Sequence, residues 1–286
     1  AVALLRQGGP NTVALAGGTA LVASGRRDVE EVVDLRHLSL SYVRVQGATL
    51  CIGATTTLQQ LVDHPELQTL SSGVLVQTAE AEAGRNLRNA ATIGGTVAGA
   101  GGDSILLATL LALDAQLTNY APESRQIPLA GFLAYRERLL DDGARISEVR
   151  LPLLIGPLGA AVASVGRTPR DRPIVCAIAR FELASEIASN VRVALGGMAV
   201  VPVRANGTEQ LLERKVLSDE RVEAAVEMAT DGLAPRDDFR GSAEYRRKVA
   251  RILARRALAL ARARAQTWGS AVNTVKGDGD EDRTDD

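Results

Sequence analysis

The first half of the chain alternates short apolar runs with glycine-rich turns and helical stretches. Residues 13–16 form an apolar run typical of a strand, and a glycine pair follows it directly. Residues 42–45 and 49–53 predict a hairpin, because two strand-like runs flank a short turn. The mostly apolar stretch 105–113 predicts a buried helix, and residues 145–151 alternate as a half-buried strand does.

The second half predicts a small antiparallel sheet followed by helices. Three strand-like stretches come first, then two helical stretches and a long final helix that begins at Ser242. Two prolines and two glycines within residues 152–159 predict the boundary between the halves. The strand-like stretches are residues 160–165, 174–183 and 190–195, and the helical ones are residues 208–215 and 218–231.

These patterns predict how the chain divides. We expect a first domain at residues 1–155, a second domain at 156–266 and a disordered acidic tail at 267–286. The last ten residues hold six acidic side chains and one Arg. Such a segment buries too little apolar surface to offset the entropy lost on ordering.

Composition excludes several classes of protein. Of the 286 residues, 46% are hydrophobic and 23% charged, as in globular proteins. No apolar run reaches the roughly 18 residues of a membrane-spanning helix. No basic-then-apolar leader opens the chain, so we expect a cytoplasmic protein without membrane insertion. A net charge of −1 and an aromatic content of 3% argue against nucleic-acid binding.

Metal-ligating residues are scarce. The two cysteines, Cys51 and Cys176, lie far apart in the sequence, and no HExxH pattern accompanies the two histidines. Two cysteines are too few to ligate an iron–sulfur cluster within this chain alone, and we predict no metal site.

A basic stretch lies near the end of the chain. Residues 236–264 carry ten basic and three acidic side chains. This charge is typical of the solvated face of an amphipathic helix, and it also suits docking on an acidic partner protein. The sequence leaves both interpretations open, and nucleic-acid binding by this stretch is a more distant third one, against which the net charge of −1 argues.

Two segments share one design, in which a short apolar strand runs into Gly-Gly-Thr and then into small residues. They span residues 15–21 and 92–98. A pyrophosphate needs converging backbone N–H donors, and glycine leaves room for its approach. Neither segment has the Lys of a P-loop or the GxGxxG spacing of a dinucleotide site. The segments are either ordinary tight turns or a site for a phosphate-bearing ligand.

Four motifs, in order along the chain, resemble those of the FAD-binding (medium) subunits of molybdenum hydroxylases, the family of xanthine dehydrogenase and aerobic carbon monoxide dehydrogenase. The resemblance covers about residues 1–266, and its most specific motif is RNAATIGG at residues 88–95. The other three are AGGT at residues 16–19, the stretch 103–115 that opens with Asp-Ser-Ile, and RGSAEYRR at residues 240–247.

The resemblance implies an α+β fold. A two-lobed FAD-binding domain of the vanillyl-alcohol-oxidase (PCMH) type would come first, and a small α+β domain with a three-stranded antiparallel sheet and helices would follow. The FAD pyrophosphate would lie on the two glycine segments. Asp103 would hydrogen-bond a hydroxyl group on the ribose or adenine side, and Ile146 would be an apolar contact. The implied cofactor-binding residues are Ala16, Gly17, Gly18, Thr19, Ala20, Leu21, Thr92, Gly94, Gly95, Ala98, Asp103 and Ile146.

The resemblance also implies a function, that of an FAD-binding electron-transfer subunit. A molybdopterin large subunit would oxidise the substrate, and an iron–sulfur small subunit with [2Fe-2S] clusters would relay the electrons to this chain. NAD, oxygen or a quinone would accept them. Binding and orienting a flavin needs no side-chain acid or base, so we predict no catalytic residues.

An alternative function is that of a non-catalytic assembly subunit of the same complex that has lost tight flavin binding. The loop before Asp103 motivates it, because that loop lacks the proline that the family usually has there. Under the first function we expect Gly18→Val and Gly94→Val each to abolish FAD retention while the chain still folds.

Overall fold

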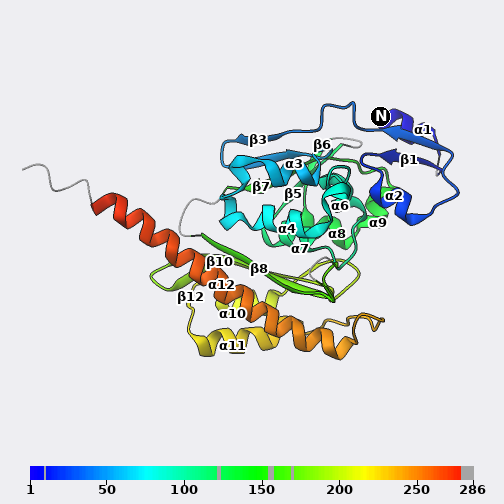
Figure 1. Ribbon diagram of the computed structural model, residues 1–286. Coiled ribbons are helices and arrows are strands. Elements are labelled where there is room, and N and C mark those ends of the chain that lie inside the picture. The colour runs from blue at the N-terminus through cyan, green and yellow to red at the C-terminus, as the bar shows by residue number, and fades with distance from the viewer. Residues whose placement is uncertain (10, 121–123, 154–157, 169–170, 278–286) are drawn as a thin grey trace, which may run out of the picture.

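A computed structural model describes the chain except for residues 10, 121–123, 154–157, 169–170 and 278–286. Two antiparallel sheets lie on either side of a layer of helices, and further helices cover the outer face of the second sheet (Figure 1). We call residues 1–153 the first lobe and residues 158–277 the second lobe. The predicted domain boundary at 155/156 falls outside the described residues.

The N-terminal unit is a small parallel pair of strands joined by a helix. Strand β1 pairs with β2 so that Val13 lies opposite Val32, and α2 connects them. Gly18 precedes α2 with a left-handed φ of 72°, a conformation that glycine adopts without strain. The unit contains α1 (Val2–Gln7), β1 (Thr12–Leu15), α2 (Thr19–Ser24) and β2 (Glu31–Asp34).

The first-lobe sheet has five strands in the order β3-β4-β7-β5-β6, and all neighbours are antiparallel. The predicted hairpin of β3 and β4 is confirmed, with Val43 opposite Ile52. Every second residue of these strands belongs to the core that packs against the helices, as the period of two of a strand requires: Leu50 and Ile52 of β4, and Val149 and Leu151 of β7. The strands are β3 (Val43–Gln46), β4 (Thr49–Gly53), β5 (Gln116–Tyr120), β6 (Ser124–Pro128) and β7 (Ile146–Pro152).

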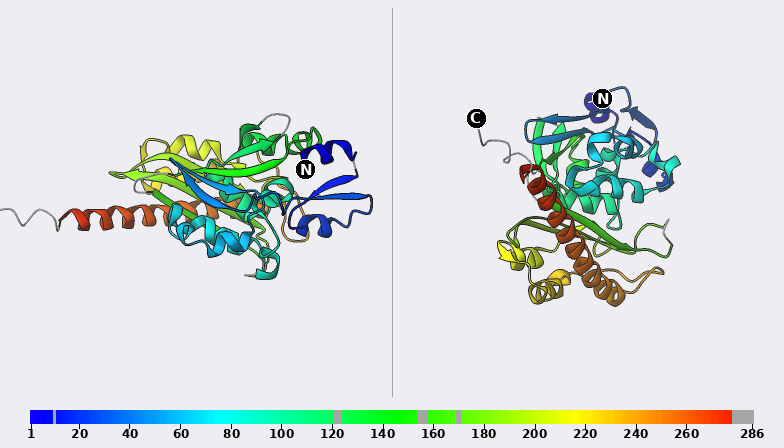
Figure 2. Two further views of the ribbon diagram at one scale, coloured as in Figure 1. Left: turned by 90° about the horizontal axis from the view of Figure 1, so that it is seen from above. Right: turned by 60° about the vertical axis from the view of Figure 1, so that its left-hand side comes forward.

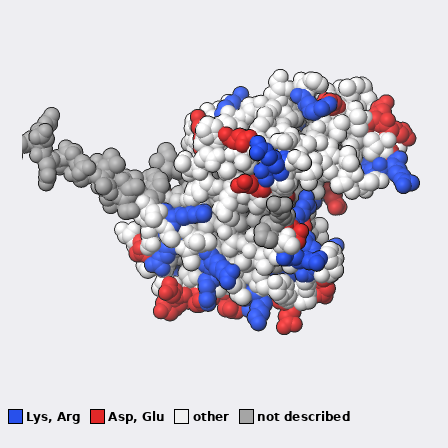
Figure 3. Space-filling model, in the orientation of Figure 1, with Lys and Arg blue, Asp and Glu red and all other residues white. Residues whose placement is uncertain are grey.

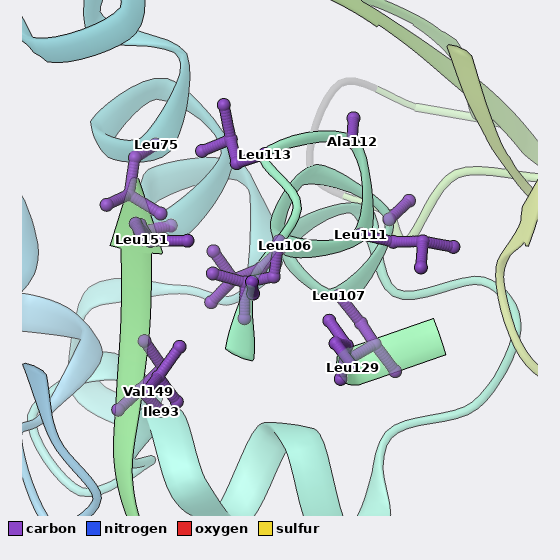
Figure 4. Packing of buried hydrophobic residues seen from close by; sticks show 14 of the residues in the cluster. Leu75, Ile93, Leu106, Leu107, Leu111, Ala112, Leu113, Leu129, Val149 and Leu151 are labelled. Atoms are coloured by element: carbon purple, nitrogen blue, oxygen red, sulfur yellow. The ribbon is translucent and has the colours of Figure 1, made fainter. Parts of the chain in front are cut away.

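Helix α7 is the centre of the first hydrophobic core. All eight of its residues are buried, as the apolar stretch predicts. Figure 4 shows its leucine side chains packed among Leu75 of α4, Ile93 of α6, Leu129 of α8 and Val149 of β7. The helices of this lobe after β4 are α3 (Leu58–Asp63), η1 (Pro65–Leu67), η2 (Leu70–Gly73), α4 (Val74–Glu82), α5 (Arg85–Arg88), α6 (Ile93–Gly99), α7 (Ile105–Ala112), α8 (Leu129–Ala134) and α9 (Arg136–Asp141).

The second-lobe sheet has five strands rather than the three that we expected. The three long ones follow the prediction, and two strands of two residues each extend the sheet beside β10. Helix α10 ends at Leu212, before the predicted 215, because Glu213 adopts an extended conformation, and Lys215 then pairs with Ala188. The strands are β8 (Leu158–Val165), β9 (Val175–Ala184), β10 (Ile187–Gly196), β11 (Val203–Arg204) and β12 (Lys215–Val216).

Strand β9 separates two cores. Cys176 and Ile178 belong to the first core with α7, whereas Ala177 and Ala179 belong to a second core under the C-terminal helices. The sheet therefore joins the lobes through one face and carries its own helical layer on the other. The helices of this layer are α10 (Asn206–Leu212), α11 (Asp219–Glu227), η3 (Met228–Thr230) and α12 (Ala243–Gly277).

Helix α12 includes residues 267–277, which we expected to belong to the tail, and the rest of the predicted tail lies outside the described residues. The helix runs to Gly277 and projects past the body at the end opposite the N-terminal unit (Figure 2). Residues 267–277 carry no acidic side chain, and all six acids of the chain's end follow Gly277, outside the described residues. Within the described part, no helix is long and apolar enough to cross a membrane.

Candidate functional site

A cleft of about 1050 Å³ lies in the first lobe, between the N-terminal unit and the elements around α6 and β7. Pockets that hold small-molecule ligands span roughly 300–1,000 Å³, so this cleft has room for a ligand as large as a dinucleotide. Every residue that the sequence predicts for the cofactor site lines the cleft, except Asp103. Segments that are some 75 residues apart in the sequence are thereby brought together.

The first glycine segment lies close to the residues that flank the second one, Ala90 and Gly99. Gly17 lies against the main chain of Ala90, and a Cβ atom on Gly17 would collide with the Ala90 carbonyl oxygen. A Cβ atom on Gly99, the last residue of α6, would come within 3.6 Å of the Cβ of Ala20 in α2. At Gly17 the absence of a side chain is what allows this close approach, whereas an added Cβ atom at Gly99 would make an ordinary van der Waals contact with Ala20.

The first segment presents unused backbone donors. The amides of residues 17–21 donate to no described residue, and no side chain caps the start of α2. The next amide, that of Val22, already donates to the Gly18 carbonyl at 2.9 Å. Successive free N–H groups in a glycine-rich bend attract anions, and the start of a helix adds positive polarity.

The second segment differs from the prediction. Residues 93–99 form α6 rather than a strand and a turn, and Thr92 caps it by accepting a hydrogen bond from the Gly95 amide at 3.1 Å. The Ile93 amide donates to Thr56 at 3.0 Å, and the Gly94 amide donates to Ala54 at 2.9 Å. The expectation that both segments offer free amides is therefore wrong for the second one. Its contribution to the cleft is a surface almost free of side chains.

Gly94 lines the cleft and also allows the start of α6 to pack closely against Ala54. A Cβ atom there would lie 2.7 Å from both the Cβ and the carbonyl oxygen of Ala54. This close contact argues against the expectation that Gly94→Val leaves the fold intact, because the valine would push on Ala54, the residue that follows β4. At Gly95, by contrast, only the Thr92 hydroxyl lies within 4 Å of an added Cβ atom, at 3.0 Å.

Asp103 lies outside the cleft. Its carboxylate accepts a hydrogen bond from Arg240 at 2.9 Å, and the guanidinium of Arg172 lies 3.8 Å away. Sequence reasoning missed these partners, although Arg240 opens the RGSAEYRR motif, and that motif was the available signal. Ile146, at the start of β7, does line the cleft and is half-buried.

Few charged side chains line the cleft, and sequence reasoning did not name them. Arg26 is bound to Asp28 at 2.6 Å, and this hydrogen bond raises the pKa of the Arg26 guanidinium. Arg145 donates to the carbonyl oxygen of Ala144 at 2.8 Å. Both arginines already have partners. The positive polarity that the cleft offers to an anion therefore comes from the backbone amides of the first glycine segment. In the described part of the chain, no group of three or more His, Cys, Asp or Glu residues is placed to hold a metal.

Comparison with known families matches nearly the whole chain. Residues 1–154 match the model of the FAD binding domain in molybdopterin dehydrogenase, and residues 160–261 match that of the CO dehydrogenase flavoprotein C-terminal domain. These two models meet at the junction of the two lobes.

Individual relatives agree with the family models. The carbon monoxide dehydrogenase medium chain of Hydrogenophaga pseudoflava is 30% identical over 92% of this chain and 94% of its own length. Subunit alpha of the 6-hydroxypseudooxynicotine dehydrogenase complex of Paenarthrobacter nicotinovorans is 32% identical over 93% and 92%. A solved structure of the Hydrogenophaga carbon monoxide dehydrogenase, in a form that lacks the Mo-pyranopterin moiety, superposes with a TM-score of 0.86 at 30% identity, over 92% of this chain and 93% of that one. The chain therefore belongs to the family of FAD-binding medium subunits of molybdopterin dehydrogenases, of the carbon monoxide dehydrogenase and xanthine dehydrogenase type.

Proposed function

We propose that this chain binds FAD in the cleft and transfers electrons from [2Fe-2S] clusters of a small partner subunit to an external acceptor such as NAD, oxygen or a quinone. A molybdopterin large subunit would oxidise the substrate of the complex. The names of the relatives support this assignment, since they are medium chains or subunits of dehydrogenase complexes. The observation that carries the proposal is the row of unused amides at residues 17–21 inside a cleft of sufficient size.

The residues present fit a flavin nucleotide. The free amides of residues 17–21 would hold the pyrophosphate, and the Thr19 hydroxyl would add a donor. Gly95, Ala98 and Gly99 would let the ligand approach the backbone of α6. Ile146 would supply an apolar contact from the other side of the cleft.

A bound flavin supplies the electron-transfer chemistry, and the protein supplies binding, orientation and electrostatics. The tasks left to this chain are to fix the nucleotide and to leave one side of it open to an acceptor. Neither task needs a side-chain acid or base, so the proposed mechanism has no catalytic residue. The clusters are assigned to a partner because both cysteines, Cys51 and Cys176, are buried and unpaired, one in each sheet.

One observation favours the alternative of an assembly subunit without tight flavin binding. The amides at the start of α6 all donate within the protein, so only one glycine segment offers free donors. The two functions differ in a single measurable property, the affinity of the chain for FAD.

FAD titration of the purified chain, followed by quenching of flavin fluorescence, separates them. Gly99→Leu places a side chain in the cleft opposite Ala20 without touching the core, and we expect it to weaken FAD binding about tenfold or more. Gly131→Leu is the matched control, because Gly131 lies in α8 outside the cleft and an added Cβ atom meets nothing within 4 Å. If the wild-type chain does not bind FAD, the result favours the function of an assembly subunit. If Gly99→Leu binds FAD as tightly as the control Gly131→Leu, the result refutes the cleft as the FAD site.

A further inference from the structure

Three arginines of the second-lobe sheet converge on one point. Arg180 of β9 lies directly opposite Arg192 of β10 in the antiparallel pair, and Arg204 lies on β11, which also pairs with β10. Like charges at directly opposite positions of a sheet are destabilising. Arg180 is also almost completely buried, with 3% of its side chain exposed. This arrangement therefore needs an anion that the three guanidinium groups can share.

The anion is a side chain of the first lobe, the carboxylate of Asp114. One of its oxygens accepts hydrogen bonds from Arg192 at 2.6 Å and from Arg180 at 3.3 Å. The other oxygen accepts one from Arg204 at 2.8 Å. Arg204 in turn donates to both carboxylate oxygens of Glu209 in α10, at 2.5 and 2.6 Å. A single residue of the first lobe thus joins three strands of the second.

Arg180 depends on Asp114 more than the other two arginines do. Among the described residues, its guanidinium makes one other hydrogen bond, at 3.4 Å to the carbonyl oxygen of Asn190, and its Nε makes none. Burial lowers the pKa of Arg180, the charge of Asp114 raises it, and the two neighbouring arginines lower it. Without the carboxylate, a buried cation would lie beside two like charges, and removing one partner of such a pair is strongly destabilising.

The backbone of Asp114 has an unusual conformation for its residue type. Asp114 follows the last turn of α7 and has a positive φ of 54°. The amide of the next residue, Ala115, donates back to the Leu110 carbonyl oxygen at 3.0 Å, as at helix ends that are closed by a left-handed residue. Glycine is the usual residue at such a position, although aspartate tolerates it. A left-handed aspartate at this place indicates that its side chain has a task.

We propose that Arg180, Arg192 and Arg204 form a carboxylate-binding site in the second lobe, and that Asp114 of the first lobe is the ligand of this site. All of their hydrogen bonds to Asp114 go to its carboxylate oxygens, so a small carboxylate anion would fit the same donors. With 30% of the Asp114 side chain exposed, small ions can reach the site. None of its residues lines the cleft, and the proposal does not depend on FAD binding.

Removal of the ligand side chain, followed by chemical rescue, tests the site on the full-length chain. Asp114→Gly removes the carboxylate and allows the left-handed backbone, so we expect the unfolding temperature in sodium chloride to fall by about 5–10 °C. Sodium formate at the same ionic strength should restore much of this loss, because formate would bind the folded state at the vacated site.

Ser39→Gly is the matched control for this substitution. Ser39 has the same φ of 54° and is exposed. We therefore expect the unfolding temperature of Ser39→Gly to stay within about 2 °C of that of the wild type. Replacing chloride with formate should shift Ser39→Gly and the wild type equally, and Asp114→Gly by more.

A second comparison tests the repulsion between the arginines. Asp114→Asn keeps the size of the side chain and removes its charge. In the wild type, Arg192→Gln should lower the unfolding temperature, because it removes a hydrogen bond to Asp114. In the Asp114→Asn background the same substitution should raise it, because it removes a like charge opposite Arg180. A change of sign between the two backgrounds is the signature of a shared anion.

Hydrogen exchange tests whether the site joins the lobes. In Asp114→Asn, we expect the amides of Ala115 in the first lobe and Val193 in the second to exchange faster than in the wild type. The Val193 amide donates to Glu209 at 2.8 Å, and Glu209 also holds Arg204, so this amide reports on the second-lobe side of the site.

Three results would overturn the proposal. The first is an equal shift by formate in Asp114→Gly and in Ser39→Gly. The second is a loss of stability from Arg192→Gln in both backgrounds, and the third is faster exchange confined to one lobe. If Asp114→Gly does not fold in chloride, refolding in formate but not in chloride would support the site, and refolding in neither salt would overturn it.

Discussion

Glu82 is a buried carboxylate that supports the start of the central helix from a neighbouring one. It lies at the end of α4 and accepts hydrogen bonds from the Ser104 hydroxyl and the Leu106 amide, each at 3.0 Å. A negative charge at the first turn of α7 suits the helix dipole. Burial nevertheless dominates and raises the pKa of Glu82 above its ordinary value, while the two hydrogen bonds act against that shift.

The raised pKa predicts a pH-dependent effect of Glu82→Gln. Because the folded state binds the proton more tightly than the unfolded state, the wild type loses stability as the pH rises through the raised pKa. Glutamine carries no charge at any pH. The unfolding temperature of the wild type, relative to that of Glu82→Gln, should therefore fall as the pH rises above about 4, the ordinary pKa of a glutamate side chain. A difference that stays constant above this pH, or grows in favour of the wild type, would contradict the assignment.

The glycines of the cleft show which features can be predicted from residue types and which cannot. Their clustering indicated where the cleft lies, because bends without side chains are identifiable by composition. Their separate tasks were not predictable. Gly18 supplies a left-handed turn, Gly17 and Gly94 allow close packing on Ala90 and Ala54, and Gly99 faces the cleft. These differences depend on contacts with residues that are distant in the sequence.

At the scale of elements, α6 is the clearest departure from the sequence prediction. The short run of Thr92 and Ile93 before two glycines resembles a strand end, and glycine disfavours a helix. The structure forms a helix there because Thr92 caps it and Ile93 is fully buried in the first core. The cap was visible in the sequence, since threonine is a common N-cap residue. The burial of Ile93 was not.

The cap predicts a stability effect. Thr92→Val removes the hydroxyl that accepts the Gly95 amide but keeps the shape of the side chain. We expect it to lower the free energy of unfolding by about 1 kcal/mol, the usual contribution of an N-cap. Thr96→Val is the control, because the Thr96 hydroxyl only donates back to the Thr92 carbonyl at 3.1 Å. Urea denaturation measures both, and equal effects of the two variants would argue against the cap.

At the scale of the whole molecule, the order of the lobes and the long strands of the second sheet were predictable from apolar runs and turn residues. The packing of that sheet between two cores was not, because it depends on which face of β9 meets α7. Acidic and basic side chains are interspersed over the face shown in Figure 3, consistent with the net charge of −1. On this face the mixed charges give no single-signed field to steer a ligand over long range. We therefore expect recognition of FAD to depend on the cleft.

The most direct test of the account is a structure of the full-length chain determined after saturation with FAD. The account predicts the pyrophosphate oxygens within about 3 Å of backbone nitrogens in residues 17–21. It also predicts the nucleotide in contact with Gly95 and Gly99. A pyrophosphate bound elsewhere, with the amides of residues 17–21 still unused, would contradict it.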